Sequence, residues 1–265
     1  MTPSSPSPFG DAILLRQTNT LSTELPLRQI EEVTRALRGA LLHHASDPAP
    51  AILSGHFPDG RPLDRTHVAF VGLPGSSQAN RLGDVALLLP REIAPADRQA
   101  ISRAIARWEL DGFQLRLGRL GALQLERAGQ MPDQTADWRA ASRRWASITA
   151  IALDENPGRL DATDAAAAAA AEQRAGEIIA RACERIDLPR PEWVRISRRS
   201  AHRAAPLASE FMPYPRHGRG LRRVCVHAEL KFAEAIEGPL LLGAGRYFGI
   251  GLCLPVADRS AGVEG

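Results

Sequence analysis

The sequence predicts an α+β protein with two tandem domains of similar design, and three observations lead to this. Patterns typical of strands and helices follow one another as strand, helix, two strands, helix and strand in the first half, and nearly so in the second. The 265 residues fit one large domain or two of ordinary size, and the repeated order favours two. With 44% hydrophobic and 24% charged residues, the chain can bury a real core.

The first predicted domain covers residues 12–129, after a polar tail of prolines and serines at residues 1–11. Its helices are predicted from apolar residues at helical spacing, and Asp97 lies in the first turn of the second helix. The predicted helices are 25–45 and 94–110, the predicted strands are 11–18, 51–53, 67–71 and 84–90, and a hairpin follows at 113–128. This is the split βαβ order of ferredoxin-like (RRM-like) domains.

The second predicted domain covers residues 140–258 and repeats this order with one change. Its predicted strands are 143–153, 192–200, 221–232 and 248–256, and its predicted helix is 175–188. The alanine tract at 161–173 fits either a flexible insert or the first turns of that helix. Alternation along 221–232 places His227 on a polar face. A glycine-rich segment stands where the second helix would be.

Charge and cysteine usage exclude several classes of protein. The net charge of +3 is a mild basic bias carried almost entirely by arginine, which either coding bias or phosphate recognition explains. Cys183, Cys225 and Cys253 lack C-x-x-C spacing, so neither a zinc site nor a disulfide framework is predicted. The sequence shows no apolar run long enough to cross a bilayer and no signal peptide. We therefore expect a cytoplasmic protein that does not bind membranes.

Five glycines lie in the stretch GPLLLGAGRYFGIGLCLP, residues 238–255. Glycines this dense indicate that the backbone bends sharply or that something approaches it closely. Their spacing, followed by a strand, does not fit a dinucleotide fingerprint, and a Walker loop would need Gly-Lys-Ser/Thr. Two interpretations stay open: a structural hairpin, or a backbone cradle for a polynucleotide with Arg246 and Tyr247 at its tip.

The stretch IEGPLLLGAGRYFGIGLCLP resembles the C-terminal glycine-rich loop of the CRISPR-associated repeat-processing endoribonucleases, the Cas-six family of the repeat-associated mysterious protein superfamily. Four further stretches are similar to the Cas-six half of the fused Cas-five/Cas-six subunit of subtype I-U, also called I-G: TRALRGALL, ILSGHFPDGRPLDRTHVAFVGLP, RRWASITAIALD and VCVHAELKF. The resemblance extends from about Asp11 to Val256. The fused subunit is longer and carries a Cas-five-like domain first; a fragment, a split gene or an internally started product would each account for the difference.

The resemblance implies a metal-independent endoribonuclease that needs no cofactor and cleaves CRISPR precursor RNA within its repeats. In this chemistry the ribose 2′-OH attacks the adjacent phosphate and leaves a 2′,3′-cyclic phosphate and a 5′-OH. The reaction needs a base, an acid and positive charge near the phosphorane. The resemblance also implies that the protein stays bound to the 3′ hairpin of the crRNA, in a type I effector (Cascade) complex with other subunits, including a Cas-five-like domain.

Histidine suits the role of base because its pKa lies near neutrality. His56, in the polar loop SGHFPDG, is the first candidate, and the alternative is a solvated or turn-capping histidine. His67 begins a predicted strand. His43 and His44 end a predicted helix, where they could instead interact only with the helix dipole. We predict that one of these four is the catalytic base.

RNA is expected to contact the glycine-rich segment and arginines at both ends of the proline-rich loop that precedes 221–232. The segment contributes Gly243, Gly245, Arg246, Tyr247 and Gly249. The arginines at the loop ends are Arg198, Arg199, Arg203, Arg222 and Arg223, with Arg216 and Arg219 inside it, and the alternative is a solvated run of charge. With only 5% aromatic residues, recognition of the RNA backbone and shape is favoured over stacking on many bases.

Two rival functions belong to other classes. A non-catalytic RNA-binding subunit of the same complex would have the same fold and would bind repeat RNA without cutting it. A nucleotide-dependent enzyme would bind a mononucleotide tightly, which we do not expect from this glycine spacing.

Overall fold

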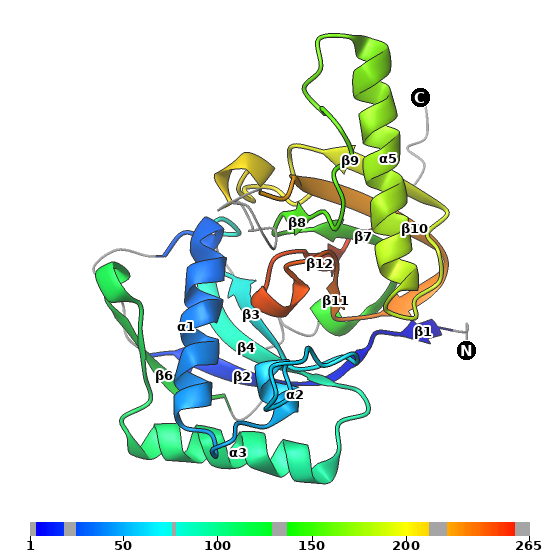
Figure 1. Ribbon diagram of the computed structural model, residues 1–265. Coiled ribbons are helices and arrows are strands. Elements are labelled where there is room, and N and C mark those ends of the chain that lie inside the picture. Colours follow the sequence, from blue (N-terminus) through cyan, green and yellow to red (C-terminus); the bar gives the residue numbers. More distant parts are fainter. Residues whose placement is uncertain (1–3, 19–24, 76–77, 129–136, 212–221, 258–265) are drawn as a thin grey trace.

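The computed structural model describes residues 4–18, 25–75, 78–128, 137–211 and 222–257. Two β-sheets form the two halves of the molecule, and helices pack beside each sheet (Figure 1). Two arginines of the predicted basic loop, Arg216 and Arg219, lie outside the described residues.

The first sheet has five strands in the order β3-β4-β2-β6-β5. Its strands are β2 (Phe9–Gln17), β3 (Ala69–Pro74), β4 (Leu82–Pro90), β5 (Gln114–Arg116) and β6 (Ala122–Arg127). The helices of this half are η1 (Leu27–Gln29), α1 (Ile30–His43), α2 (Ala51–Ser54), α3 (Pro95–Leu110) and η2 (Gly118–Leu120). Along the chain, β2, α1, β3, β4, α3 and β6 have the split βαβ order predicted from the sequence.

The second sheet has seven strands, with the path β1-β10-β7-β12-β11 and with β8 and β9 also paired to β10. Its strands are β1 (Ser4–Pro6), β7 (Ala141–Ser147), β8 (Ile151–Ala152), β9 (Trp193–Ser197), β10 (Cys225–Glu237), β11 (Leu240–Leu241) and β12 (Leu252–Pro255). Its helices are η3 (Asp137–Arg139), α5 (Ala165–Glu184), η4 (Ala208–Glu210) and η5 (Arg246–Phe248). The strands β12, β7, β10 and β9 lie side by side in the same relative order as β6, β2, β4 and β3 of the first sheet.

The apolar residues predicted at helical spacing lie on the side of η1 and α1 that packs into the hydrophobic core of the first half. Leu27, Ile30, Val33, Leu37 and Leu41 are all fully buried. Burying one such side chain stabilises the fold by roughly 1.5–3 kcal/mol, so this stripe fixes α1 firmly in the core of the first half. The opposite side of α1 is left to carry polar and charged residues.

The alanine tract is helical rather than a flexible insert. α5 begins at Ala165, and the Asp164 carboxylate caps it by accepting hydrogen bonds from the backbone N–H groups of residues 166–167. The apolar residues of its later turns, such as Ile178 and Ile179, are buried against the second sheet. High alanine propensity and an N-cap are thus enough to begin the helix before its packed part starts.

Two predicted elements differ in the structure. Residues 51–53 belong to the helical turn α2, not to a strand, because Pro50 precedes the turn and Gly55 ends it in the left-handed conformation with φ 74°. Within the predicted tail, Ser4–Pro6 form β1, which pairs in parallel with β10 of the second sheet. The start of the chain thus joins the second sheet before it enters the first.

His227 is not on a solvated face, contrary to the prediction. Its side chain is 1% exposed, because the segment that contains Pro206 and Phe211 covers this face of β10. One ring nitrogen lies 2.9 Å from the Ser147 hydroxyl and the other 3.0 Å from the Pro206 carbonyl oxygen. Burial lowers the pKa of His227, so the ring stays neutral and structural.

The three cysteines occupy core or strand positions. Cys183 and Cys253 are buried, Cys225 is half-buried, and all three are free thiols. Within the described ranges, no helix is both long and apolar enough to span a bilayer.

Candidate functional site

The glycine-rich segment forms a tight turn between β11 and β12. Gly249 and Gly251 both have positive φ, 72° and 89°. A Cβ at position 251 would lie 2.0 Å from the Leu242 carbonyl oxygen, and one at position 249 would lie 3.1 Å from Ile30 of α1. These glycines are therefore needed for the segment to pack against its own protein.

The backbone of this segment is not an open cradle, which corrects one expectation. Gly243, Gly245 and Gly249 are buried. The space beside Gly245 is filled by the Ile250 side chain, which would be 2.6 Å from an added Cβ. The segment instead presents outward the three half-buried side chains of η5.

Two threonines hold η5 between the two domains. The Thr34 hydroxyl on α1 lies 2.9 Å from the Phe248 carbonyl oxygen and equally near the Ile30 carbonyl oxygen of its own helix. The buried Thr149 hydroxyl donates to the Gly249 carbonyl oxygen (2.8 Å) and accepts from the backbone N–H groups of residues 251–252 (3.0 and 2.9 Å). Figure 1 shows η5, in red, lying beside α1 and β3 of the first half. Both domains therefore fix the position of this tip.

His67 contacts the tip from the first domain. Its ring stacks on Tyr247 with 3.6 Å between the centroids and 21° between the planes. Its Nδ1 donates to the Val68 carbonyl oxygen (3.0 Å), so Nε2 carries the lone pair. Gly55 closes that side, because a Cβ there would lie 2.9 Å from Nε2. His67 is therefore enclosed both by Tyr247 and by Gly55.

The environment of His67 keeps its imidazole uncharged. Burial is the main cause that lowers its pKa to about 4, and the positive charges of Arg246, Arg38 and His56 lower it further. These charges act on His67 only because the side chains lie close to it. The contacts agree with this, because Arg246 lies over the Tyr247 ring that stacks on His67, and Gly55, the residue before His56, borders the His67 ring.

His56 follows directly after α2 and is exposed. Its Nδ1 lies 3.3 Å from the Ser54 carbonyl oxygen, and the same oxygen accepts a hydrogen bond from Arg38 Nη2 (2.6 Å). A carbonyl can only accept, so this contact places the proton of a neutral His56 on Nδ1 and the lone pair on Nε2. The lone pair of His56 is thereby left for a molecule outside the protein.

His56, His67, Arg38, Arg246 and Tyr247 form one cluster. The protein does not neutralise the positive charge in this cluster. Neither Arg38 nor Arg246 has a carboxylate within ion-pair distance in the described ranges. The Arg246 guanidinium lies over the Tyr247 ring, 4.6 Å from its centroid, and donates to the Gly243 carbonyl oxygen (3.3 Å). An arrangement of cations without acids favours an anionic ligand. No cluster of three or more potential metal-ligating side chains occurs in the part of the chain that the structure describes.

A model of the family described as CRISPR-associated protein, GSU0054 family, matches residues 118–255, just over half of the chain. The chain belongs to this family. No curated protein matches the sequence.

Solved structures of Cas6 proteins match this GSU0054-family chain at low sequence identity. A crystal structure of Cas6b has a TM-score of 0.51 at 9% identity, covering 92% of this chain and 98% of that chain. A CRISPR-associated protein Cas6 has a TM-score of 0.41 at 12% identity, covering 93% and 98%. A Cas6 product complex has a TM-score of 0.43 at 14% identity, covering 92% and 98%. The Cas6b match confirms the predicted α+β fold of two ferredoxin-like domains. The family match shows a CRISPR-associated protein, and its fold is Cas6-like.

In this GSU0054-family protein, His43 and His44 lie away from the cluster. They are at the far end of α1 from Thr34, beside α3. His44 Nδ1 donates to the Ala40 carbonyl oxygen (2.7 Å), its Nε2 lies 3.2 Å from an Asp111 carboxylate oxygen, and its ring packs along Trp108. These contacts use both ring nitrogens of His44 within the protein. The four candidate histidines thus separate into two places.

The predicted basic loop ends divide into exposed and structural arginines. Arg198, Arg199, Arg203 and Arg222 are exposed. The Arg223 guanidinium instead donates to the carbonyl oxygens of residues 153–154 (3.1 and 2.5 Å), which ties the start of β10 to the chain after β8. Arg223 therefore has a structural role that accounts for it.

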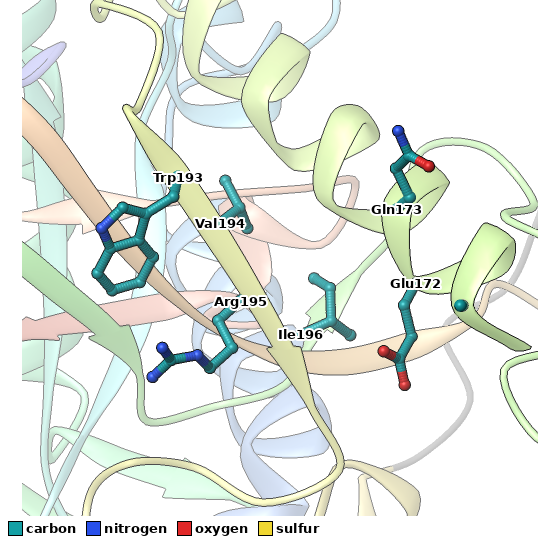
Figure 2. A pocket seen from close by; sticks show the side chains of 7 residues that line it. Glu172, Gln173, Trp193, Val194, Arg195 and Ile196 are labelled. Atoms are coloured by element: carbon teal, nitrogen blue, oxygen red, sulfur yellow. The ribbon is translucent and has the colours of Figure 1, made fainter.

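A separate pocket of ≈ 420 Å³ lies between α5 and β9 (Figure 2). Val194 and Ile196 point toward α5, whereas Trp193 and Arg195 point to the other side of the strand. Among the described residues, no histidine lines this pocket, and Glu172 is its one acidic lining residue. The candidate site of the family member is therefore the cluster at η5 and not this pocket.

Sequence reasoning missed three contributors to the cluster: Arg38, Gly55 and Thr34. From the helical pattern alone, Arg38 is simply a surface residue. The sequence could have indicated a role for Arg38 only through its position off the apolar stripe of α1. That the second domain docks on this side of α1 is visible only in three dimensions.

Proposed function

We propose that this protein is a metal-independent endoribonuclease that cleaves CRISPR precursor RNA within its repeats. Membership of a CRISPR-associated family supports the substrate class. The observation that carries the proposal is the meeting of His56 and His67 of the first domain with Arg246 and Tyr247 of the second. A base and uncompensated positive charge are the groups that attack by a ribose 2′-OH requires.

In the proposed reaction, His56 Nε2 takes the proton of the 2′-OH as the 2′ oxygen bonds to phosphorus. The bond from phosphorus to the 5′ oxygen then breaks, and this leaving oxygen takes a proton from the Tyr247 hydroxyl. Afterwards His56 releases the proton that it took to water, and the Tyr247 phenolate takes one proton from water, so both groups return to their starting states. The products are a 2′,3′-cyclic phosphate and a 5′-OH. Arg246 contributes positive charge as the phosphorane forms.

His56 is the better base of the two histidines in the cluster. Its lone pair at Nε2 is on an exposed side chain, whereas His67 Nε2 is closed in by Gly55. A base must reach the proton that it removes. We assign His67 a positioning role instead: its ring supports Tyr247 and so holds the tip of the second domain in place.

The exposed arginines at the loop ends are proposed to bind the phosphates of the repeat hairpin. Arg198, Arg199 and Arg203 are exposed, and an arginine fork suits phosphate binding, so their proposed part is in binding. After cleavage the protein would stay on the crRNA 3′ hairpin within a type I effector complex that includes a Cas-five-like domain. We propose that this complex is of subtype I-U, also called I-G.

The test uses a synthetic RNA with the repeat of the host's CRISPR array. We expect cleavage in the presence of a chelator, no cleavage when the residue before the cut carries a 2′-deoxyribose, and a product that ends in a cyclic phosphate by mass spectrometry. Tight binding with no product at any protein concentration would instead identify a non-catalytic RNA-binding subunit.

A further inference from the structure

Arg38 differs from its neighbour Arg35 on α1 in its partners. Arg35, one turn earlier, pairs with the Glu31 carboxylate (2.7 Å) and lies over the Phe248 ring (4.6 Å). Arg38 has no carboxylate partner among the described residues, and its one hydrogen bond within them goes to the Ser54 carbonyl oxygen (2.6 Å). It is also half-buried, and a half-buried cation without a counter-charge is costly unless an anion binds beside it.

The hydrogen bond to Ser54 aims the guanidinium at the cluster. Ser54 O also contacts His56 Nδ1, so Arg38 and His56 are held by the same backbone atom. Arg38 lies near enough to His67 for its charge to act on that ring. One nitrogen of the planar fork is used for Ser54, and the fork has further N–H donors that reach no protein acceptor in the described part of the chain.

We propose that Arg38 is a catalytic residue that binds the scissile phosphate. The inference rests on the proposed function and adds a residue to it: the free N–H donors of Arg38 bind a non-bridging phosphate oxygen, while the bond to Ser54 keeps the guanidinium next to the base. Charge on these oxygens rises as the phosphorane forms, so the interaction strengthens in the transition state. Arg38 approaches from the first domain and Arg246 from the second, so the phosphate lies between them.

The test compares Arg38→Ala, Arg38→Lys and Arg35→Ala in single-turnover cleavage of the repeat RNA, with binding measured separately by fluorescence anisotropy. We expect Arg38→Ala to slow cleavage about 100-fold or more, the typical effect of removing one donor to a developing oxyanion, with little change in Kd. Arg38→Lys keeps the charge but loses the fork and should be intermediate. Arg35→Ala removes a charge that Glu31 already neutralises together with a contact to Phe248, so it should slow cleavage far less than Arg38→Ala.

A merely structural role would not be rescued by a soluble analogue. We therefore expect millimolar guanidinium to restore part of the cleavage by Arg38→Ala and none of that by His56→Ala. Wild-type cleavage by Arg38→Ala, or a rise in Kd as large as the loss of rate, would overturn the role of Arg38 while leaving the endoribonuclease intact. A wild-type protein that never cuts the RNA would overturn the function itself.

Discussion

The two domains share a strand order, but they differ in the element that follows the third strand of that order, which is β4 in the first domain and β10 in the second. In the first, β4 leads into α3, a helix of 16 residues. In the second, β10 leads into β11, η5 and β12, so a short glycine-rich turn stands where that helix would be. The turn is small enough to enter the first domain beside α1 and β3. Because a short turn stands here instead of a helix, the second domain can place Arg246 and Tyr247 against the histidines of the first.

The largest effect is expected when the first domain loses its proposed catalytic base, His56. His56→Ala should lower the cleavage rate by about 10²–10⁴-fold, the usual contribution of a general base, and leave the Kd for repeat RNA within about threefold. His43→Ala is the matched control, since that histidine is also exposed but lies at the other end of α1. If the two variants cut equally well, His56 is not the base.

The next effect comes from forcing the tip away from the first domain. Gly249→Ala should reduce the free energy of unfolding by roughly 2–5 kcal/mol, from left-handed strain plus crowding against Ile30. Gly118→Ala is matched, because Gly118 also has positive φ (56°) but has open space around its Cα, so only about 1–2 kcal/mol of strain is expected. Urea denaturation measures both, and equal losses would show that crowding against Ile30 and the β3 backbone contributes nothing.

A smaller effect separates the positioning role of His67 from a role as base. His67→Ala removes the ring stacked on Tyr247, and loss of an aromatic pair should slow cleavage about tenfold. His67→Phe keeps a ring that cannot accept a proton, and it should cut within about twofold of wild type. A His67→Phe protein as inactive as His56→Ala would move the proton transfer to His67.

The last effect is on stability, and it is seen only at mildly acid pH. The pKa of His67 is about 4 in the folded protein, against about 6.5 when unfolded. The unfolded state therefore binds more protons below about pH 6.5, so the stabilisation is complete above that pH and is lost as the pH falls toward 4. Wild type should lose roughly 2 kcal/mol more than His67→Phe between pH 7.5 and 5 in urea denaturation. Parallel loss by both proteins would contradict the buried, neutral state of His67.

Local patterns predicted most of the fold but only part of the site. The stripe at Ile30, Val33 and Leu37 sets the position of α1, and Asp164 with the alanines sets the start of α5, because periodicity and capping act between near neighbours. The strand assignment for 51–53 was wrong because three apolar residues suit a strand or one helical turn equally well, and the flanking Pro50 and Gly55 decided.

The site depends on contacts that no short window contains. Thr34 and Phe248 are distant in sequence, as are His67 and Tyr247, yet each pair is in contact. His227 shows the same limit in reverse: alternation placed it on a polar face, but a remote segment covers that face. The candidate histidines could be named from the sequence, whereas the choice among them needed the docking of one domain on the other.

Thr149 lies in the core, but the fold uses its oxygen rather than its bulk. That single atom satisfies three main-chain groups of the turn that reaches into the first domain. Valine has nearly the same shape and would leave all three without a partner. Among the other amino acids only serine carries a hydroxyl on the same carbon. This interior position therefore tolerates far fewer replacements than an ordinary packing site. One side-chain oxygen thus holds the turn by which the second domain contacts the first.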